Sequence, residues 1–422
     1  MINILIYYEH LAREWNALCR LKEILTKMGA NVKICSIIYE KNKAFIWSLK
    51  HKPDVVLVPW FVDNIHEQMI YPIYRINRKV KIINLHHEQV SCAAYETVLF
   101  PKTDFTKNGS YHFTWGQYFY ERLVKNGVSE NKIVVTGNIR NDEALNNHLS
   151  RQYLSEVYHL NLDKKWILFA ENRGWLENRN DSFTKKELMD RGMTEENVEN
   201  SIKYTQKSLD SFFREMNVLD AKFFEEYEFI YRPHPGTQVL RELNTNIHVI
   251  KDESIYSWIR NCDLYLTCES TSIFEAELCK VPCATIDLEE EPENLKMVGV
   301  HEYPKLGHLK DIDEEKIKWF LECQNKNLSI YKRYLGEVDG KACVRTAKAI
   351  FKIAGKTEEN VYLLKNAKKT FLLKQAVYEI VTFFIVKLHM LSVLKYPRSA
   401  YIESKDIPYS NENMWIYKKD KN

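Results

Sequence analysis

The sequence of 422 residues has little glycine, no strong excess of either charge and no long run of uncharged apolar residues. Its 13 glycines exclude a glycine-rich fibrous protein, and a hydrophobic content of 45% excludes a wholly disordered chain. The 60 basic and 57 acidic residues give a formal charge of +3, so we expect no nucleic-acid partner. No run reaches the roughly 18–20 uncharged apolar residues of a membrane-spanning helix. The length predicts about two or three domains.

Several motifs that carry chemistry are also absent. The sequence contains no Walker A, G-x-G-x-x-G, H-E-x-x-H, EF-hand or G-x-S-x-G motif. The sequence therefore does not support assignment to the P-loop kinases, the zinc proteases or the α/β-hydrolases. The Asp-x-Asp spacing of Asp311 and Asp313 leads into a helix-like run rather than ending a strand. We expect neither a metal ion nor a bound cofactor.

The nine cysteines are odd in number and scattered through apolar runs. The first three residues lead straight into a strand-like run, without the basic segment of a secretory signal. We therefore expect reduced cysteines in a cytosolic protein. Cys279 and Cys283 have the spacing of a metal pair on a helix, but no second Cys/His pair accompanies them, which favours packing.

Short β-rich runs alternate with helical runs through the first 150 residues. Residues 2–8 form a strand-like run, residues 11–28 have helical spacing of apolar side chains, and Gly29 precedes the next strand-like run at 32–39. Further strand-like runs occupy residues 55–61, 81–85, 111–115 and 132–136. Strands that alternate with helices predict parallel βαβ units in a doubly wound sheet.

The same pattern restarts after a connecting segment at residues 141–165. A helix is predicted over residues 201–216, and the polar stretch 171–200 is interpreted as a mobile loop or an acceptor-binding insertion. Strand-like runs occupy residues 166–170, 228–232, 247–250, 262–267 and 282–287. We predict an α/β fold with Rossmann-like domains at 1–150 and 151–356, facing across a cleft, and C-terminal helices at 357–422.

The strongest local signal is the run Arg232-Pro233-His234-Pro235-Gly236, which directly follows a predicted strand. Two prolines stiffen this exit, and Gly236 permits a ligand to approach the backbone closely. Arg232 and His234 then stand at the carboxyl edge of the sheet, where a phosphate could bind. The alternative is a rigid turn that holds a hydrogen-bonded histidine.

The second signal is the run CESTSIFEA at residues 268–276, which follows another predicted strand and opens a helix. Ser270, Thr271 and Ser272 fall where the N-terminus of a helix offers unpaired N–H groups, and Glu275 lies one turn further on. The alternative is an ordinary capping box between Ser272 and Glu275. A capped helix start can also bind a phosphate, so the two interpretations are compatible.

Together these two runs resemble nucleotide-dependent transferases of the GT-B fold. The resemblance is to capsule Kdo and other ulosonic-acid transferases and to teichoic-acid glycerophosphotransferases, and it is specific over residues 229–287. It implies a GT-B-like pair of domains and a nucleotide-activated donor, linked to CMP if the enzyme is an ulosonic-acid transferase. It further implies that His234 and the Ser270–Ser272 segment bind donor phosphates, and that Glu275 contacts the nucleotide.

A third run, Leu85-His86-His87-Glu88-Gln89, ends a predicted strand of the first half. His86, His87 and Glu88 are candidates for accepting a proton from an attacking hydroxyl. Adjacent histidines on a strand point to opposite faces, so a metal site with two histidines is not expected. A packing or solvated role is the alternative. The run also resembles the His-Glu loop of nucleotide-sugar 2-epimerases, but no Ala-Gly-x-Arg follows it.

Two weaker runs complete the candidate site. Gly137, Asn138 and Arg140 end the last strand of the first half, where Gly137 permits close approach and Arg140 could pair with a phosphate or carboxylate. Hinge geometry is the alternative there. Asn172 and Arg173 follow the first strand of the second half, in the loop that contacts the donor diphosphate or its sugar in GT-B proteins.

The most apolar segment, residues 371–396, is interrupted by Lys374, Glu379, Lys387 and His389. Its aromatic and aliphatic residues and the lysines around it are typical of a helix that lies in a membrane interface. The alternative is a helix packed on its own domain. Neither interpretation is favoured by the sequence.

These runs predict a cytosolic glycosyltransferase, near the inner face of the membrane, that builds a bacterial surface polysaccharide such as capsule or lipopolysaccharide. It would move a sugar from a nucleotide-activated donor, bound by the second half, to a glycan or lipid-linked acceptor. The alternatives are a CDP-glycerol or ribitol-type polyol-phosphate transferase, a nucleotide-sugar 2-epimerase, and a non-catalytic polysaccharide-assembly protein.

Overall fold

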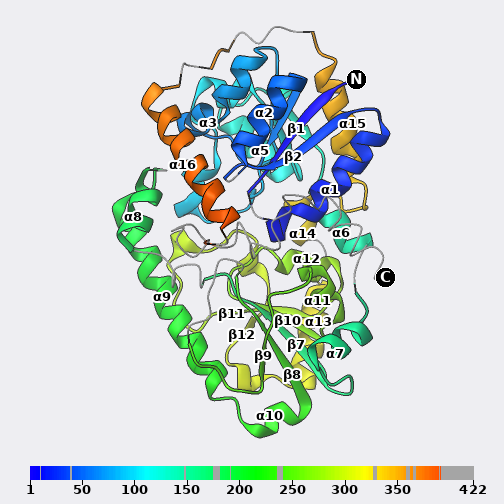
Figure 1. The fold of residues 1–422 in the computed structure, drawn as a ribbon. Helices are drawn as coiled ribbons and strands as arrows, with labels where there is room; N and C mark the ends of the chain where they lie inside the picture. The colour runs from blue at the N-terminus through cyan, green and yellow to red at the C-terminus, as the bar shows by residue number, and fades with distance from the viewer. Residues whose placement is uncertain are drawn as a thin grey trace. The chain divides into compact units, whose positions relative to one another are not determined.

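The computed structural model describes residues 1–9, 11–38, 40–146, 149–173, 181–190, 192–234, 241–326, 330–357, 362–364, 367–388 and 390. The chain divides into two compact units. Unit 1 comprises Met1–Gln89, Leu99–Leu145 and Leu335–Asn422, and unit 2 comprises Val90–Val98 and Asn146–Tyr334. Each unit contains one six-stranded sheet, and every strand pair in both sheets is parallel (Figure 1).

The sheet of unit 1 has the strand order β2-β1-β3-β4-β5-β6. Its strands are β1 (Asn3–Tyr8), β2 (Asn31–Ser36), β3 (Val55–Val58), β4 (Lys81–Asn84), β5 (Tyr111–Thr114) and β6 (Ile133–Val135). The α-helices are α1 (Leu11–Lys27), α2 (Lys41–His51), α3 (Asn64–Ile76), α5 (Gln117–Lys125), α6 (Asn141–Asn146), α15 (Ala342–Ala354) and α16 (Lys369–Lys387). Short helical turns are η2 (Phe105–Gly109) and η3 (Glu130–Lys132).

The sheet of unit 2 has the order β12-β11-β10-β7-β8-β9. Its strands are β7 (Lys165–Ala170), β8 (Tyr227–Arg232), β9 (Ile247–Val249), β10 (Leu264–Thr267), β11 (Cys283–Ile286) and β12 (Lys305–Leu306). The α-helices are α7 (Arg151–Tyr158), α8 (Asp181–Asp190), α9 (Glu195–Asn217), α10 (Ala221–Glu226), α11 (Ile255–Asn261), α12 (Ile273–Leu278), α13 (Glu314–Lys326) and α14 (Ile330–Leu335). Short helical elements are η1 (Ala93–Tyr95), α4 (Glu96–Leu99), η5 (Glu293–Leu295), η6 (Val300–Glu302) and η7 (Leu309–Asp311).

Both sheets are covered on their two faces, which explains the continuous apolar runs in the sequence. In unit 1, Leu18 and Leu21 of α1 pack on one face of the sheet, while Ile70 of α3 packs on the other. In unit 2, α9 places Phe212 against Phe169 of β7, with ring centroids 3.8 Å apart. The predicted alternation of strands and helices is confirmed in both halves.

The division of the chain differs from the predicted boundary at residue 356. Helix α15 belongs to unit 1, because Cys343, Ala347 and Ile350 are fully buried in the core that α1 and β1 form. Ala342 and Cys343, at its N-terminus, donate backbone N–H bonds to the carboxylate of Asp142, at 2.9 and 2.8 Å. The chain therefore returns to the first sheet after completing the second.

We expect Asp142→Ala to lower the stability of unit 1 by about 2–3 kcal/mol, because two buried N–H groups of α15 lose their charged acceptor. For a unit of this size, the unfolding midpoint should fall by about 4–12 °C. Differential scanning calorimetry of the full chain measures this change. Asp142→Asn, which keeps one acceptor oxygen, should fall in between, and Asp104→Ala, at an exposed position, should match wild type. Equal midpoints for Asp142→Ala and Asp104→Ala would contradict this role.

The polar stretch at residues 171–200 is more ordered than the predicted loop. Helix α8 spans Asp181–Asp190, and α9 begins at Glu195 rather than near residue 201. The side chain of Thr194 caps α9 by accepting the Asn197 N–H, and two glutamates occupy its first turn. The loop interpretation was therefore wrong for both helical parts, while residues 174–180 and 191 lie outside the described residues.

Candidate functional site

The strand order of unit 2 places a topological switch point between β7 and β10. From β7 the chain adds strands on one side through β8 and β9, and later on the other side through β10, β11 and β12. Open α/β sheets bind ligands outside the carboxyl ends of the strands at such a point. In unit 2 these ends lead into Glu171, Asn172 and Arg173 after β7 and into Cys268 and Glu269 after β10.

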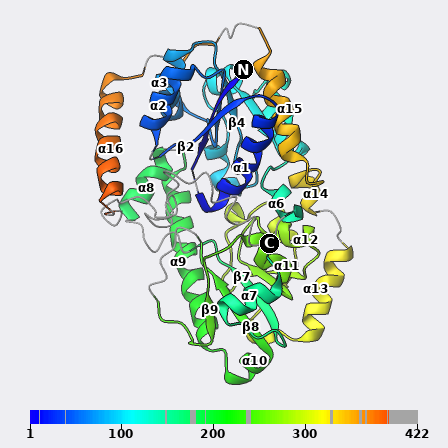
Figure 2. The same cartoon turned by 45° about the vertical axis from the view of Figure 1, so that its right-hand side comes forward.

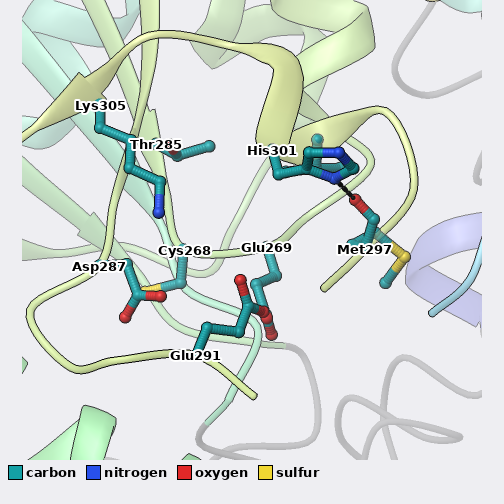
Figure 3. Close-up of a pocket in the computed structure, with 9 residues that line it drawn as sticks. Cys268, Glu269, Thr285, Asp287, Glu291, Met297, His301 and Lys305 are labelled. Carbon is teal, nitrogen blue, oxygen red and sulfur yellow. Dashed lines mark hydrogen bonds between the residues drawn. The ribbon is translucent and has the colours of Figure 1, made fainter. Parts of the chain in front are cut away.

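A shallow pocket that is open to solvent, with room for about one water molecule, lies at this edge of the sheet. Figure 3 shows Glu269, Asp287 and Glu291 on one side of it and Lys305 and His301 on the other. The remaining lining residues are Cys268, Thr285, Met297 and Val300. Carboxylates accept hydrogen bonds, so this lining suits a ligand rich in hydroxyl groups.

Arg173 supports the carboxylates of this pocket from within the protein. Its side chain is 3% exposed, and its guanidinium lies 3.3 Å from Glu269 Oε2 and 3.6 Å from Asp287 Oδ1. It donates to Tyr204 Oη at 2.8 Å and also to Ser208 Oγ, and the Tyr204 hydroxyl donates to Asp287 Oδ2 at 2.7 Å. The predicted phosphate ligand Arg173 is thus already paired with carboxylates.

Burial and charge act in opposite directions around Arg173. Burial lowers the pKa of Arg173, but Cys268, Tyr204, Asp287 and Glu291 together raise it above its usual value, so the side chain stays charged. Burial raises the pKa of Glu291 and outweighs the opposing effect of Arg173, while it raises the pKa of the Cys268 thiol to about 12. Among the described residues, no group of three His, Cys, Asp or Glu side chains could hold a metal ion.

The first predicted signal mainly stabilises the segment that follows β9, through Arg232 at the end of β8. Arg232 donates to the backbone carbonyls of Asp252 and Glu253, at 2.7 and 2.5 Å, and burial lowers its pKa to about 10. The backbone N–H of His234 donates to Glu171 Oε2 at 3.4 Å, which brings it to the end of β7. Gly236 lies outside the described residues.

The second predicted signal forms a hydroxyl cluster at the carboxyl end of β10. Ser272 Oγ lies 2.6 Å from Ser270 Oγ and 2.5 Å from the hydroxyl of Tyr265, and Thr271 stands between the two serines in the chain. The hydroxyl of Tyr256 donates to Glu275 Oε1 at 3.3 Å. The Ser272 side chain makes no capping bond to α12, so the capping-box alternative was wrong.

In unit 1, the three candidate residues of the third predicted signal lie in different environments. His86 lies in the core, whereas His87 and Glu88 lie near Glu14 and Arg13 at the start of α1. His86 is 3% exposed and has a positive φ of 45°, and its Nε2 lies 2.8 Å from His112 Nδ1. Burial, with His112 and His87 nearby, lowers its pKa well below the usual value. The structure therefore places the candidate base His86 in the core, against Phe119.

His87 lies beside the carboxylate of Glu14, a residue outside the predicted site. Its Nε2 is 3.3 Å from Glu14 Oε2, without the alignment of a hydrogen bond, and Glu14 is fully buried. Arg13 donates to Glu14 Oε1 and to Glu88 Oε1, at 2.9 and 2.8 Å for its two terminal nitrogens. Burial lowers the pKa of His87 to about 4, against the opposing effect of Glu14, so His87 is neutral at neutral pH.

In the weaker run at residues 136–142, Gly137 packs against α15, whereas the side chains of Asn138 and Arg140 have buried polar atoms. A Cβ on Gly137, which has a φ of 85°, would lie 2.7 Å from Arg345 Nη2 and 3.1 Å from Ala342, so this glycine allows α15 to approach, not a ligand. Arg140 donates to the His87 carbonyl at 3.3 Å. Its Nε and Asn138 Nδ2 are buried polar atoms without a hydrogen-bond partner in the described structure.

The indole N–H of Trp15 is another buried N–H group of unit 1. Its Nε1 is buried without a partner in the described structure, and its ring packs edge-on against Tyr8, the last residue of β1. Glu14 and Trp15 lie in α1 and follow β1, which borders the switch point between β1 and β3. The signal that the sequence holds for them is their position near the start of the first predicted helix, directly after the first strand.

Comparison of the sequence with protein-family models gave no match, and comparison with curated proteins gave none either. Solved structures are similar at low identity. The wall teichoic acid polymerase TagF, soaked with CDPG, has 13% identity and a TM-score of 0.51, over 83% of this chain and 88% of that one. The UDP-GlcNAc 2-epimerase from Neisseria meningitidis, bound to UDP-GlcNAc, has 14% identity and a TM-score of 0.49, over 83% of this chain and 100% of that one. The likeness to TagF shows the fold and confirms the predicted GT-B-like α/β architecture.

Proposed function

We propose that this protein is a glycosyltransferase of bacterial surface-polysaccharide biosynthesis. It would move a sugar from a nucleotide-activated donor to a glycan or lipid-linked acceptor, near the inner face of the cytoplasmic membrane. Unit 2 would bind the donor and unit 1 the acceptor. The fold supports this assignment, because GT-B-like folds with two nucleotide-binding-type sheets offer a ligand edge in each unit.

The observation that carries the proposal is the carboxylate pocket at the switch point of unit 2. Glu269, Asp287 and Glu291 would accept hydrogen bonds from hydroxyls of the donor's ribose or sugar, with Arg173 holding two of them in place. The hydroxyls of Ser270 and Ser272, next to Glu269 in the chain, would donate to the donor phosphates. Fixed donors at the leaving phosphate would stabilise the charge that develops as its bond to the sugar breaks.

In unit 1, His87 is the candidate base. The acceptor hydroxyl would attack the anomeric carbon, the bond to the nucleotide phosphate would break, and the hydroxyl proton would pass to the neutral imidazole. The buried N–H groups of Trp15, Asn138 and Arg140 would donate to acceptor oxygens. Glu14 would orient His87 and stabilise its protonated form.

We expect calorimetry with CMP, CDP, UDP, GDP and CDP-glycerol to show selective binding of one nucleotide. At 100 times its dissociation constant, that ligand should stabilise the protein by about 2.7 kcal/mol. CMP would support an ulosonic-acid donor and CDP-glycerol the polyol-phosphate alternative. UDP or GDP would fit a hexose donor or the 2-epimerase alternative, which differs because it needs no acceptor. No binding by any member of the panel would contradict the proposal and favour a non-catalytic assembly protein.

The variant Glu269→Gln tests whether the pocket holds the donor. Loss of a charged hydrogen-bond acceptor should weaken binding of the intact nucleotide sugar by about tenfold to a hundredfold. Glu225→Gln, at an exposed position of the same unit, is the matched control and should bind as wild type does. Equal affinities for the two variants would place the donor outside this pocket.

A further inference from the structure

The outer face of α16 exposes a stripe of large apolar side chains. Leu373 and Leu388, near the ends of the stripe, are 66% and 65% exposed. The other members are Val377, Ile380, Val381 and Phe384. Soluble proteins rarely leave such a contiguous apolar stripe uncovered, so the stripe marks an interaction surface.

The buried side chain of Glu379 shows which face of α16 points inward. Glu379 is 7% exposed, accepts the backbone N–H of Asn42 at the start of α2, and lies next to Lys41. At about 100° per residue, the six apolar residues lie about 100–200° around the helix from Glu379. The helix therefore packs through one face, and the opposite face, which carries the stripe, stays in solvent.

Helix α2 adds apolar side chains beside α16 in the same unit. Phe45, Ile46 and Leu49 of α2 are all exposed, Ile46 by 67%. Both views of the fold show α16 running alongside the part of unit 1 that contains α2 (Figures 1 and 2). We call the exposed residues of α2 and α16 the α2/α16 surface.

The charge of the α2/α16 surface is of one sign. Lys50 in α2 and Lys374 in α16 are exposed, as are Lys52, Lys368 and Lys369 at or near the helix ends. The acidic residues of this region, Glu40 and Glu379, are buried and lie next to Lys43 and Lys41. Among the described residues of the two helices, no carboxylate is exposed. Apolar side chains bordered by lysines match an anionic bilayer, whose headgroups attract lysine while its acyl boundary accepts apolar groups.

We propose that the α2/α16 surface docks on a lipid bilayer that contains anionic lipid. Among the described residues, no helix has the length and apolarity needed to cross a bilayer, so α16 would lie in the interface. The sequence alone left membrane contact and packing as alternatives for this segment. One face of α16 packs on its own unit and the other would meet the bilayer, with the exposed side chains of the adjacent helix α2 as a second contact. The inference does not depend on the proposed activity, since binding to vesicles needs neither donor nor acceptor.

Co-sedimentation of the full-length protein with vesicles tests the proposal. We expect strong binding to phosphatidylcholine vesicles that contain phosphatidylglycerol, weaker binding to phosphatidylcholine alone, and loss of the difference at high salt. Equal binding to both vesicle types would overturn the assigned role of the lysines. No binding to either would overturn the proposal as a whole.

Two variants locate the surface. Val377→Asp combined with Ile46→Asp should weaken vesicle binding about tenfold or more, and Lys50→Glu combined with Lys374→Glu should do the same only for anionic vesicles. Val218→Asp and Lys222→Glu, at exposed positions in unit 2, are matched controls that should bind as wild type does. Unfolding midpoints near the wild-type value would show that the variants fold. If the apolar variant instead abolishes self-association in light scattering and leaves vesicle binding intact, the surface joins two copies of the chain and the proposal fails.

Discussion

Replacing His87 with alanine is expected to lower the turnover of sugar transfer by about 10²- to 10⁴-fold, the usual contribution of a general base. The neutral ring is present at neutral pH because burial holds the pKa of His87 at about 4. The measurement is nucleotide release from whichever donor calorimetry identifies, with acceptor present. His308→Ala, at an exposed histidine of unit 2, should keep wild-type turnover.

Glu14 is the positioning residue in this prediction. Glu14→Gln should lower turnover by less than His87→Ala, and the double variant should be no slower than His87→Ala alone, because the two side chains act as a unit. Additive losses would mean that Glu14 affects turnover by some other route. A thermal midpoint close to that of wild type is required, since Glu14 also holds Arg13 and the backbone N–H of Glu9.

The pH profile gives a readout that a purely structural role for Glu14 would not change. His87 accepts a proton only while it is neutral, so kcat/KM should fall as the pH drops through about 4 rather than near the usual histidine value. The negative charge of Glu14 favours protonated His87 and so raises its pKa. Removing that charge in Glu14→Gln should therefore shift the acid limb to lower pH. An unchanged limb would contradict the pairing.

The fold could be predicted from sequence because its signals are local. Apolar runs such as residues 166–170 and 228–232 coincide with buried strands, and Gly29 ends α1 where the helical spacing stops. The extra helix α8 was missed because residues 171–200 are polar, and helices on a surface need only one apolar stripe. The return of α15 to unit 1 was missed because it depends on Asp142, about 200 residues earlier in the chain.

The candidate site was predicted by region but not by side-chain role. Sequence placed His86 and His87 equally at the end of β4, yet the strand stops at Asn84 and the positive φ of His86 turns it toward His112. Arg232 ends one strand and Arg173 follows another, but Arg232 binds backbone carbonyls whereas Arg173 pairs with carboxylates from two segments. Such partners lie far apart in the chain, so no spacing rule could reveal them.

Replacing Arg173 with methionine is expected to destabilise unit 2 by about 3–5 kcal/mol, the effect of leaving buried carboxylates without their cation. Asp287 and Glu269 lie 3.6 and 3.3 Å from the guanidinium, and its own side chain is only 3% exposed. At about 2–4 °C per kcal/mol, the calorimetric midpoint should fall by about 6–20 °C. The deficit should shrink as the pH falls, because protonation of the two carboxylates removes the uncompensated charge.

Arg333→Met is the matched control, since this arginine is 59% exposed in its pair with Glu302. Exposed pairs contribute about 0–1 kcal/mol, so its midpoint should stay near that of wild type. The comparison also separates the two roles that Arg173 can have. If Arg173 supports the pocket, Arg173→Met loses stability with no ligand present. If Arg173→Met instead keeps the wild-type midpoint and loses only donor affinity, then Arg173 binds the donor phosphate directly, and the carboxylates do not depend on it.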